Sequence, residues 1–199
     1  SLRFAAHPKA HGTNIVFGGS VIAGTRAKKE RSKSYNAFSS INYPDIAVIQ
    51  DRRIVFYIDD KNHVTDRIRF YHDLDEKVFL LKLIPGSNAS IIDSLCDSVD
   101  ALIIESFGVG GLPDYGDDEF YQAIRRFVEK GKIVIMATQV THEGSDMTVY
   151  QVGKMIKREF SLLESYDMTL EATVAKTMWA LHESTDQNTF REKFYKKIN

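Results

Sequence analysis

The stretches ALIIESF (residues 101–107) and IVIMATQ (residues 133–139) enclose a pattern typical of an amphipathic helix. We predict strands at residues 101–105 and 133–137, and another at 78–84, because short continuous apolar runs are typical of parallel strands with both faces buried. Buried strands that alternate with helices predict an α/β fold, in which helices cover both faces of a parallel sheet.

Helices are predicted between and after these strands. Asp117 is expected to cap the helix that separates the two stretches, where Phe120, Ile124 and Phe127 recur with helical spacing. Thr169 is expected to cap a later helix. The remaining helices are predicted at residues 88–96, 148–160 and 187–198. We therefore predict that residues 77–199 form a complete C-terminal α/β domain of Rossmann-like or flavodoxin-like type.

A different pattern precedes residue 77. Short apolar runs flank the Gly-Gly-Ser turn at residues 18–20 and the polar residues 50–53, which predicts two β-hairpins. Between the hairpins, residues 24–44 are polar and are predicted to form a loop, which is too long for a passive connection. We interpret residues 1–76 as the last β-hairpins of a truncated N-terminal α/β domain, followed by the interdomain linker.

The composition excludes several classes of protein. An apolar fraction of 43% and a charged fraction of 27% exclude a disordered chain. The net charge of −1 provides no global field that would attract nucleic acid or an anionic membrane. Cys96 is the only cysteine, so no intrachain disulfide can form, and we expect a buried thiol in a reducing, cytoplasmic setting. No apolar run approaches the ~20 residues that cross a bilayer.

Two loops are candidate binding sites. The sequence GVGGLP at residues 108–113 follows a strand and precedes a helix, where open α/β sheets place ligands. Pro113 stands where the dinucleotide motif needs glycine, so we favour a ligand-facing or interface loop. Residues 26–33 hold five cations and one acid, a net charge of +4. They could contact phosphates, remain a solvated surface, or hold a lysine whose lowered pKa makes it a base.

Six motifs follow one another along the chain. They are GTRAKK (residues 24–29), FSSINYP (38–44), SFGVG (106–110), TQ (138–139), DMTVYQVG (146–153) and YDMTLEATVAK (166–176). In these motifs and their order, the chain resembles the bacterial L-asparaginases, and among them the type I, cytoplasmic branch. The resemblance extends from about residue 12 to residue 183.

The resemblance implies a two-domain α/β amidohydrolase that needs no metal and no cofactor, with this chain as its C-terminal part. The family's Gly-x-Arg-x-x-Lys pattern places the catalytic lysine at Lys29, which would relay a proton for the nucleophile. The family's nucleophilic threonine, in a Gly-Gly-Thr turn, and its His-Gly-Thr-Asp motif are both missing from the sequence. We therefore expect this chain by itself to be inactive.

The resemblance also identifies positions of a possible effector site. Some type I enzymes bind asparagine as an activator, and the corresponding positions here are Glu105, Thr138, Gln139 and Val140. Glu105 stands where those enzymes have arginine, and its charge would repel the carboxylate of the effector. We therefore expect activation by asparagine to be absent or altered. A substrate contact from the neighbouring subunit is also in doubt, because the loop continues as Gly111-Leu112-Pro113.

The function that the resemblance implies is hydrolysis of L-asparagine to L-aspartate and ammonia by the full-length enzyme, with a threonine outside this chain as nucleophile. The expected small-molecule partner is L-asparagine, and no binding of nucleic acid or membrane is expected. The full-length protein is expected to form a homodimer or homotetramer. Two alternatives stay open. One is the ammonia-releasing subunit of a tRNA-dependent amidotransferase, and the other is a free-standing α/β module for ligand binding or assembly.

Overall fold

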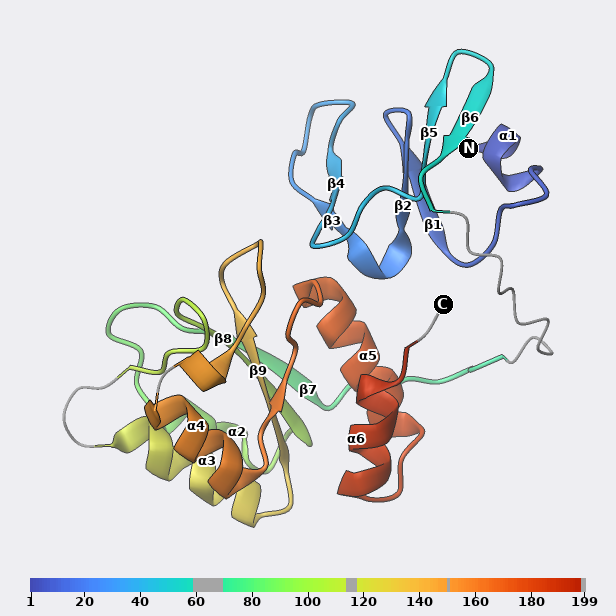
Figure 1. Cartoon of the computed structure of the whole chain (residues 1–199). Coiled ribbons are helices and arrows are strands. Elements are labelled where there is room, and N and C mark those ends of the chain that lie inside the picture. Colours follow the sequence, from blue (N-terminus) through green and yellow to red (C-terminus); the bar gives the residue numbers. More distant parts are fainter. Residues whose placement is uncertain (59–69, 114–117, 150, 198–199) are drawn as a thin grey trace. The chain divides into compact units, whose positions relative to one another are not determined.

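A computed structural model of the chain describes residues 1–58, 70–113, 118–149 and 151–197, without the side chains of residues 151–153 and 155. The chain divides into two units, one formed by Ser1–His72 with Lys197–Asn199 and the other by Asp73–Lys196 (Figure 1). Within the described residues, the longest apolar helix falls short of what a membrane crossing requires.

The second unit is built on a parallel sheet with the strand order β10-β9-β8-β7. Its strands are β7 (Val78–Lys82), β8 (Ala101–Ser106), β9 (Ile133–Thr138) and β10 (Leu163–Glu164). Every residue of β8 is buried, as expected for a central strand. The predicted α/β fold with a parallel sheet is confirmed.

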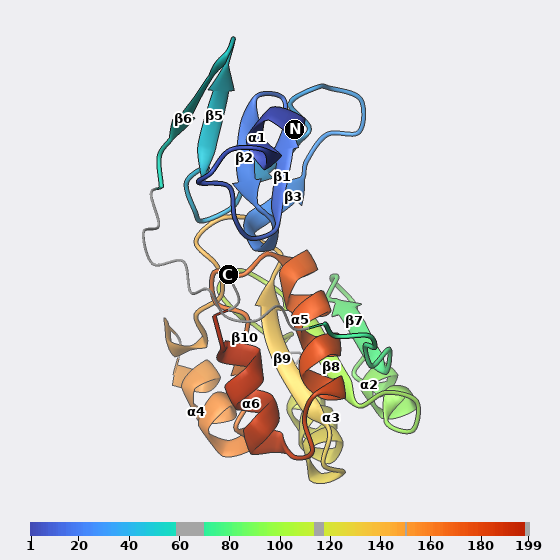
Figure 2. The same ribbon diagram turned by 90° about the vertical axis from the view of Figure 1, so that its right-hand side faces the viewer.

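Helices cover both faces of this sheet (Figures 1 and 2). One face carries α2 (Ser90–Leu95), α3 (Glu119–Glu129) and α4 (Gln151–Phe160). The other carries α5 (Leu170–His182) and α6 (Gln187–Tyr195). The strands add to the sheet in chain order, and right-handed crossovers in one constant direction place their helices on the same face. This accounts for the common face of α2, α3 and α4.

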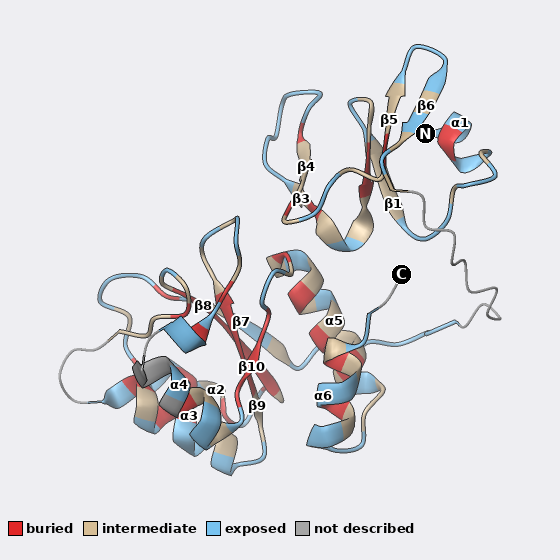
Figure 3. Ribbon diagram, viewed as in Figure 1, coloured by how far each residue is buried: buried red, intermediate tan, exposed pale blue. Residues whose placement is uncertain are grey.

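Each face of the sheet has its own core (Figure 3). On the α2–α4 face, Leu102 and Ile104 of β8 pack with residues of α3 such as Ile124 and Phe127. On the α5–α6 face, Ile103 and Ile135 pack with Phe190 and Phe194. The alternation along β8 follows from the pleat of a strand, which directs successive side chains to opposite faces. Cys96 is a buried free thiol, as predicted.

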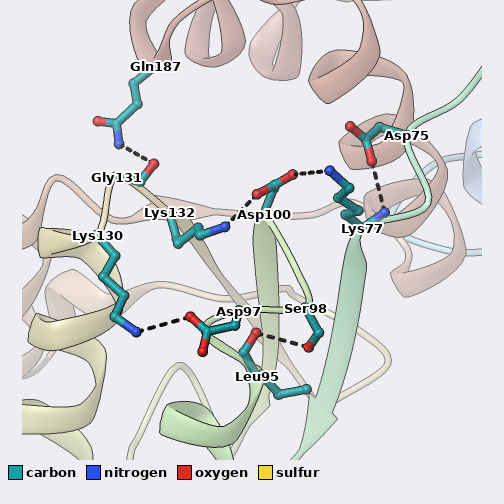
Figure 4. A network of polar contacts seen from close by, with 10 residues as sticks. All are labelled: Asp75, Lys77, Leu95, Asp97, Ser98, Asp100, Lys130, Gly131, Lys132 and Gln187. Atoms are coloured by element: carbon teal, nitrogen blue, oxygen red, sulfur yellow. Dashed lines mark hydrogen bonds and ion pairs between the residues drawn. The ribbon is translucent and has the colours of Figure 1, made fainter.

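The amino ends of three strands are joined by ion pairs around Asp100 (Figure 4). Asp100 precedes β8, and its carboxylate contacts Nζ of Lys132 at 2.6 Å and Nζ of Lys77 at 3.5 Å. Lys132 precedes β9 and Lys77 precedes β7. One carboxylate thus connects the starts of three neighbouring strands.

The helix caps agree only partly with the predictions. The Thr169 hydroxyl accepts a hydrogen bond from the Ala172 amide, so the predicted cap of α5 is confirmed. Helix α3 begins at Glu119, which makes Asp118 its N-cap, without a side-chain hydrogen bond. Asp117 lies outside the described residues.

Two further elements differ from the prediction. Strand β10 was not predicted, because a two-residue strand is too short to produce a period in the sequence. The helix predicted at 148–160 begins at residue 151, after a 3-10 turn at Met147–Val149. The turn follows Asp146, whose carboxylate accepts hydrogen bonds from the amide and hydroxyl of Thr148.

The first unit begins with the short helix α1 (Leu2–Ala5), and its main sheet has the order β1-β2-β5-β6. Strands β1 (Asn14–Phe17) and β2 (Ser20–Ala23) form the first predicted hairpin. Strands β5 (Ala47–Gln50) and β6 (Arg53–Phe56) form the second. Gly18 and Gly19 have φ of +58° and +90°, which a tight hairpin turn of this type requires. Both predicted hairpins are confirmed.

The polar stretch 24–44 is not the irregular loop that we predicted. It contains a 3-10 turn at Gly24–Arg26 and a small hairpin of β3 (Ala27–Lys29) and β4 (Phe38–Ser40). The buried Ala27, Ala37 and Ile41 anchor this hairpin. The prediction was wrong because the pairing partners lie about ten residues apart and the intervening residues are polar, so neither strand shows a hydrophobic alternation.

Candidate active site

Lys29 is the last residue of β3 and pairs across the hairpin with Phe38. Its side chain is exposed, and Nζ lies 5.9 Å from the centroid of the Phe38 ring. The Phe38 ring in turn packs edge-on against Phe17, with 5.3 Å between the centroids. The aromatic contacts therefore support the stem of Lys29 and leave its ammonium group at the surface of the unit.

The surroundings of Lys29 are polar. Next to it, the Glu30 carboxylate accepts a hydrogen bond of 2.5 Å from the Ser39 hydroxyl. Ser40 Oγ is buried and has no hydrogen-bond partner among the residues that the structure describes. The first unit thus holds an accessible ammonium group and a buried hydroxyl on one small hairpin.

The four predicted effector positions lie in the second unit, at the carboxyl ends of the parallel strands. Glu105 of β8 is buried, and its Oε1 lies 3.0 Å from Nζ of Lys82, its neighbour on β7. This ion pair gives the Glu105 charge a partner within the sheet.

Thr138 and Gln139 use their side chains to hold main chain. The Gln139 amide donates hydrogen bonds to the carbonyl oxygens of Leu83, at 2.5 Å, and of Glu105, at 3.1 Å. The Thr138 hydroxyl donates to the Gly108 carbonyl and accepts from the amide of Val140 at 3.0 Å. Val140 itself is half exposed. These residues connect the ends of β7, β8 and β9, which is where the fold brings the predicted positions together.

The glycine loop after β8 is closed on itself. Phe107 and Gly111 form an isolated bridge, with hydrogen bonds of 3.1 and 2.8 Å between their amides and carbonyls. A side chain at Gly110 would meet Met147 Cγ at 2.9 Å, because the loop packs against the 3-10 turn that precedes α4. Gly110 therefore allows the loop to pack closely against Met147, which favours a structural role for this glycine over contact with a ligand.

Sequence reasoning missed a polar cluster around Glu164, which is fully buried. Its carboxylate accepts a hydrogen bond of 2.6 Å from the Met147 amide and forms an ion pair with Lys157 of α4. Lys157 also contacts the Tyr166 hydroxyl at 3.1 Å, and the Tyr195 hydroxyl accepts from the Glu164 amide at 2.9 Å. The sequence offered little signal, because these residues come from separate elements.

The cluster shifts two pKa values. Burial acts against the charge of Lys157, but hydrogen bonds with Glu164 and Tyr166 outweigh it and raise its pKa. Burial also raises the pKa of Tyr195. Both groups are therefore protonated at neutral pH. The ion pair joins α4 to β10, and the hydrogen bonds of the Tyr195 hydroxyl with the Glu164 main chain join β10 to α6.

No group of three or more His, Cys, Asp or Glu side chains within the described ranges is arranged to bind a metal ion.

Comparisons with known proteins match both units. The model of the glutaminase/asparaginase C-terminal domain matches residues 77–194, and the N-terminal asparaginase model matches residues 1–62. An L-asparaginase of Thermococcus kodakarensis is 32% identical over 182 residues, which cover 91% of this chain and 54% of the relative. A glutamyl-tRNA(Gln) amidotransferase subunit of Pyrococcus furiosus is 32% identical over 82% of this chain and 37% of its own length.

Solved structures agree with these matches. The thermostable L-asparaginase of Thermococcus kodakarensis superposes with a TM-score of 0.83 at 30% identity, covering 98% of this chain and 60% of that one. L-asparaginase I of Vibrio cholerae has the same fold, with a TM-score of 0.78 at 23% identity, over 93% of this chain and 55% of its own. The chain thus spans about half the length of the L-asparaginases that it matches. On its sequence and its fold, the chain belongs to the glutaminase/asparaginase family.

Proposed function

We propose that this chain is the C-terminal portion of an L-asparaginase of the type I, cytoplasmic branch, which hydrolyses L-asparagine to L-aspartate and ammonia. The observation that carries the proposal is the 32% identity to the Thermococcus enzyme over 91% of the chain. In this proposal, residues 1–76 are the end of the N-terminal domain with its linker, and residues 77–199 are the C-terminal domain.

Lys29 is the proposed catalytic residue of this portion. In its neutral amine form, the Lys29 side chain at the end of β3 can accept the proton of a nucleophilic hydroxyl, which then attacks the carbon of the side-chain amide, and the ammonium so formed can return that proton to the leaving nitrogen. Backbone amides would stabilise the oxyanion before ammonia leaves, and water then releases L-aspartate. The accessible position of Lys29 supports this role, because the hydroxyl must reach it from other polypeptide.

The nucleophile is proposed to lie outside this chain. The family's Gly-Gly-Thr turn and His-Gly-Thr-Asp motif have no counterpart in the sequence, and His11-Gly12-Thr13-Asn14 lies at the start of the β1–β2 hairpin, which precedes the lysine hairpin. No metal or organic cofactor is needed for the proposed reaction. The proposed assembly is a homodimer or homotetramer.

The test uses two proteins, assayed for release of ammonia from L-asparagine. The 199-residue chain should remain at background. A chimera, in which the preceding part of the Thermococcus enzyme is joined to this chain, should be active. Lys29→Ala should reduce kcat of the chimera by about 10²–10⁴-fold, the usual contribution of proton transfer by a positioned side chain.

Lys33→Ala is the matched control, since Lys33 is an exposed lysine of the same hairpin connection. It should leave kcat unchanged. Turnover by the 199-residue chain alone would refute the proposed location of the nucleophile. An active chimera that is insensitive to Lys29→Ala would refute the role of the lysine.

A second candidate function is supported by the similarity to the amidotransferase subunit of Pyrococcus furiosus. In this alternative, the chain belongs to a subunit that releases ammonia for amidation of misacylated tRNA. The net charge of +4 over residues 26–33 is compatible with a nearby polyanion. Salt-dependent binding of Glu-tRNA(Gln) to the chimera would favour this function, and its absence together with asparagine hydrolysis would favour the first.

Activation by asparagine is proposed to be absent or altered. The ion pair of Glu105 with Lys82 supports this, because it keeps a carboxylate where an activating site would need a cation. Hyperbolic dependence of the chimera's rate on asparagine would agree with it, whereas sigmoidal dependence abolished by Glu105→Gln would contradict it.

A further inference from the structure

The second unit contains a half-open cavity of about 580 Å³ between α4 and α6, away from the carboxyl ends of the strands. Figures 1 and 2 show the two helices on opposite sides of the β10 edge of the sheet. The register pairs Leu163 with Ile135, so β9 extends past the start of β10 by Ile133 and Val134. These two residues line the cavity, which exists because the edge strand is so short.

The cavity is lined by cations, without a carboxylate among its described lining residues. Lys154, Lys157 and Arg158 come from α4, Arg191 comes from α6, and Lys132 lies before β9. Lys132 and Lys157 are neutralised by the ion pairs with Asp100 and Glu164. The positive charge of the cavity therefore comes from the other three residues, Lys154, Arg158 and Arg191.

None of these three cations forms a close ion pair within the described residues, although the charge of Lys154 acts on the Asp146 carboxylate. Lys154 and Arg158 are exposed and form no ion pair there, and Arg191 packs its guanidinium over the Tyr195 ring at 5.5 Å. Lys154 and Arg158 are four residues apart on α4, where like charges repel and reduce helix stability. A bound anion would remove this repulsion.

The rest of the lining combines polar groups with an apolar wall. The Ser161 hydroxyl and the amides of Gln187 and Asn188 can donate hydrogen bonds, whereas the Thr148 hydroxyl already donates to the Asp146 carboxylate. The apolar wall is formed by Val128, Ile133, Val134, Phe160, Leu162, Leu163 and Phe190. A ligand that satisfies this surface carries a compact multiple negative charge on one part and an apolar ring or chain on another.

We propose that this cavity binds a small organic phosphate of mononucleotide size. Arginine and lysine are the side chains that most often bind phosphate oxygens, through charge-assisted hydrogen bonds. The volume lies in the range of about 300–1,000 Å³ that small-molecule sites occupy. The proposal does not rest on the hydrolase activity, because none of these residues belongs to the hairpin that carries Lys29.

The test is isothermal titration of the 199-residue chain with inorganic pyrophosphate and with adenosine 5′-monophosphate. Both should bind with 1:1 stoichiometry, compete with each other, and bind more tightly than adenosine. Lys154→Ala/Arg158→Ala should weaken both by at least about tenfold, since each lost charge-assisted contact costs affinity. Arg191→Gln should weaken them in the same direction.

The matched control is Arg125→Ala/Lys130→Ala, which removes the same charge from the region of α3 outside the cavity. It should leave both affinities unchanged, and thermal melting should show that all variants are folded. The proposal is overturned if neither probe binds at millimolar concentration, or if binding survives the cavity variants. It is equally overturned if a single-stranded RNA decamer binds and pyrophosphate does not displace it, because the surface would then serve nucleic acid.

Discussion

Glu164 shows how a single buried carboxylate can organise its surroundings. It is fully buried, whereas the side chain of its partner Lys157 is 20% exposed. Glu164→Gln should destabilise the chain by about 2–3 kcal/mol, because it leaves the lysine without a counter-charge in a buried setting. The midpoint and slope of urea denaturation, followed by circular dichroism, measure this loss.

Glu129→Gln provides the comparison for Glu164, since it removes one carboxylate from an exposed ion pair with Arg125. Exposed pairs contribute little, so this change should stay within about 0.5 kcal/mol. Equal losses in the two variants would show that the burial of Glu164 contributes nothing to the strength of its pair.

Gly144 and Gly131 form a second matched pair at the scale of residues. Both have positive φ, +85° and +78°. A side chain at Gly144 would meet the Tyr166 carbonyl oxygen at 2.3 Å, while one at Gly131 would meet nothing within 4 Å. Gly131→Ala should therefore cost about 1 kcal/mol for its backbone conformation alone, and Gly144→Ala clearly more. Thermal denaturation of both variants shows which loses more stability. A larger loss for Gly131→Ala than for Gly144→Ala would contradict the packing described for Gly144.

At the scale of elements, Asp100 connects the starts of β7, β8 and β9. The hydrogen bond from Lys132 lowers the pKa of Asp100, against the effect of burial, and the charges of Lys132 and Lys77 add to it. The unfolded chain therefore binds this proton more readily than the folded chain. The ion pairs contribute their full stability above the ordinary carboxyl pKa of about 3.9, and the contribution is lost as the pH falls through the lowered value.

Asp100→Asn should consequently reduce the difference in unfolding free energy between pH 7 and pH 3. Urea denaturation at the two pH values, compared with the unaltered chain, measures this. Asp97→Asn is the control, because the Asp97 side chain is 97% exposed. If Asp97→Asn reduces the pH dependence as much as Asp100→Asn does, the ion pairs of Asp100 are not the source of the pH dependence.

The two units differ in how much core they contain. The unit Asp73–Lys196 encloses two apolar cores, one on each face of its sheet. The core cluster of the first unit has only Phe4, Val21 and Ala47 as its buried members among the described residues. Small cores seldom stabilise a fold independently.

We therefore expect residues 73–196, expressed alone, to fold and to melt cooperatively, whereas residues 1–72 alone should lack a cooperative transition. Near-ultraviolet circular dichroism with temperature tests both. A flat near-ultraviolet spectrum for residues 73–196 would contradict the idea that its cores are sufficient.

Across the whole molecule, the elements with a strong local pattern were predicted well. The apolar runs of β8 and β9, the Gly-Gly turn of the first hairpin and the cap of α5 are all encoded within a few neighbouring residues. The elements that were missed are β10 and the β3–β4 hairpin. Both are short, and both exist only because a distant strand or a buried anchor accepts their pairing.

Of the candidate sites, too, one part is encoded in a local motif and another part arises only from tertiary packing. The motif predicts Lys29 as a site residue, and this stays a prediction, whereas the exposed place of Lys29 at the end of a strand depends on the pairing of Ala27 with Ser40. The cluster around Glu164 and the basic cavity were missed, because their residues come from elements that are separated along the chain and meet only in the folded unit.

Local patterns in the sequence specify the class of fold, the positions of the long strands and helices, and the family resemblance, because periodicity, turn chemistry and short motifs act between near neighbours. Which charges are buried, which are paired and where a cavity remains is set by tertiary packing. Those outcomes depend on strand order and on the length of an edge strand, and no local pattern specifies either.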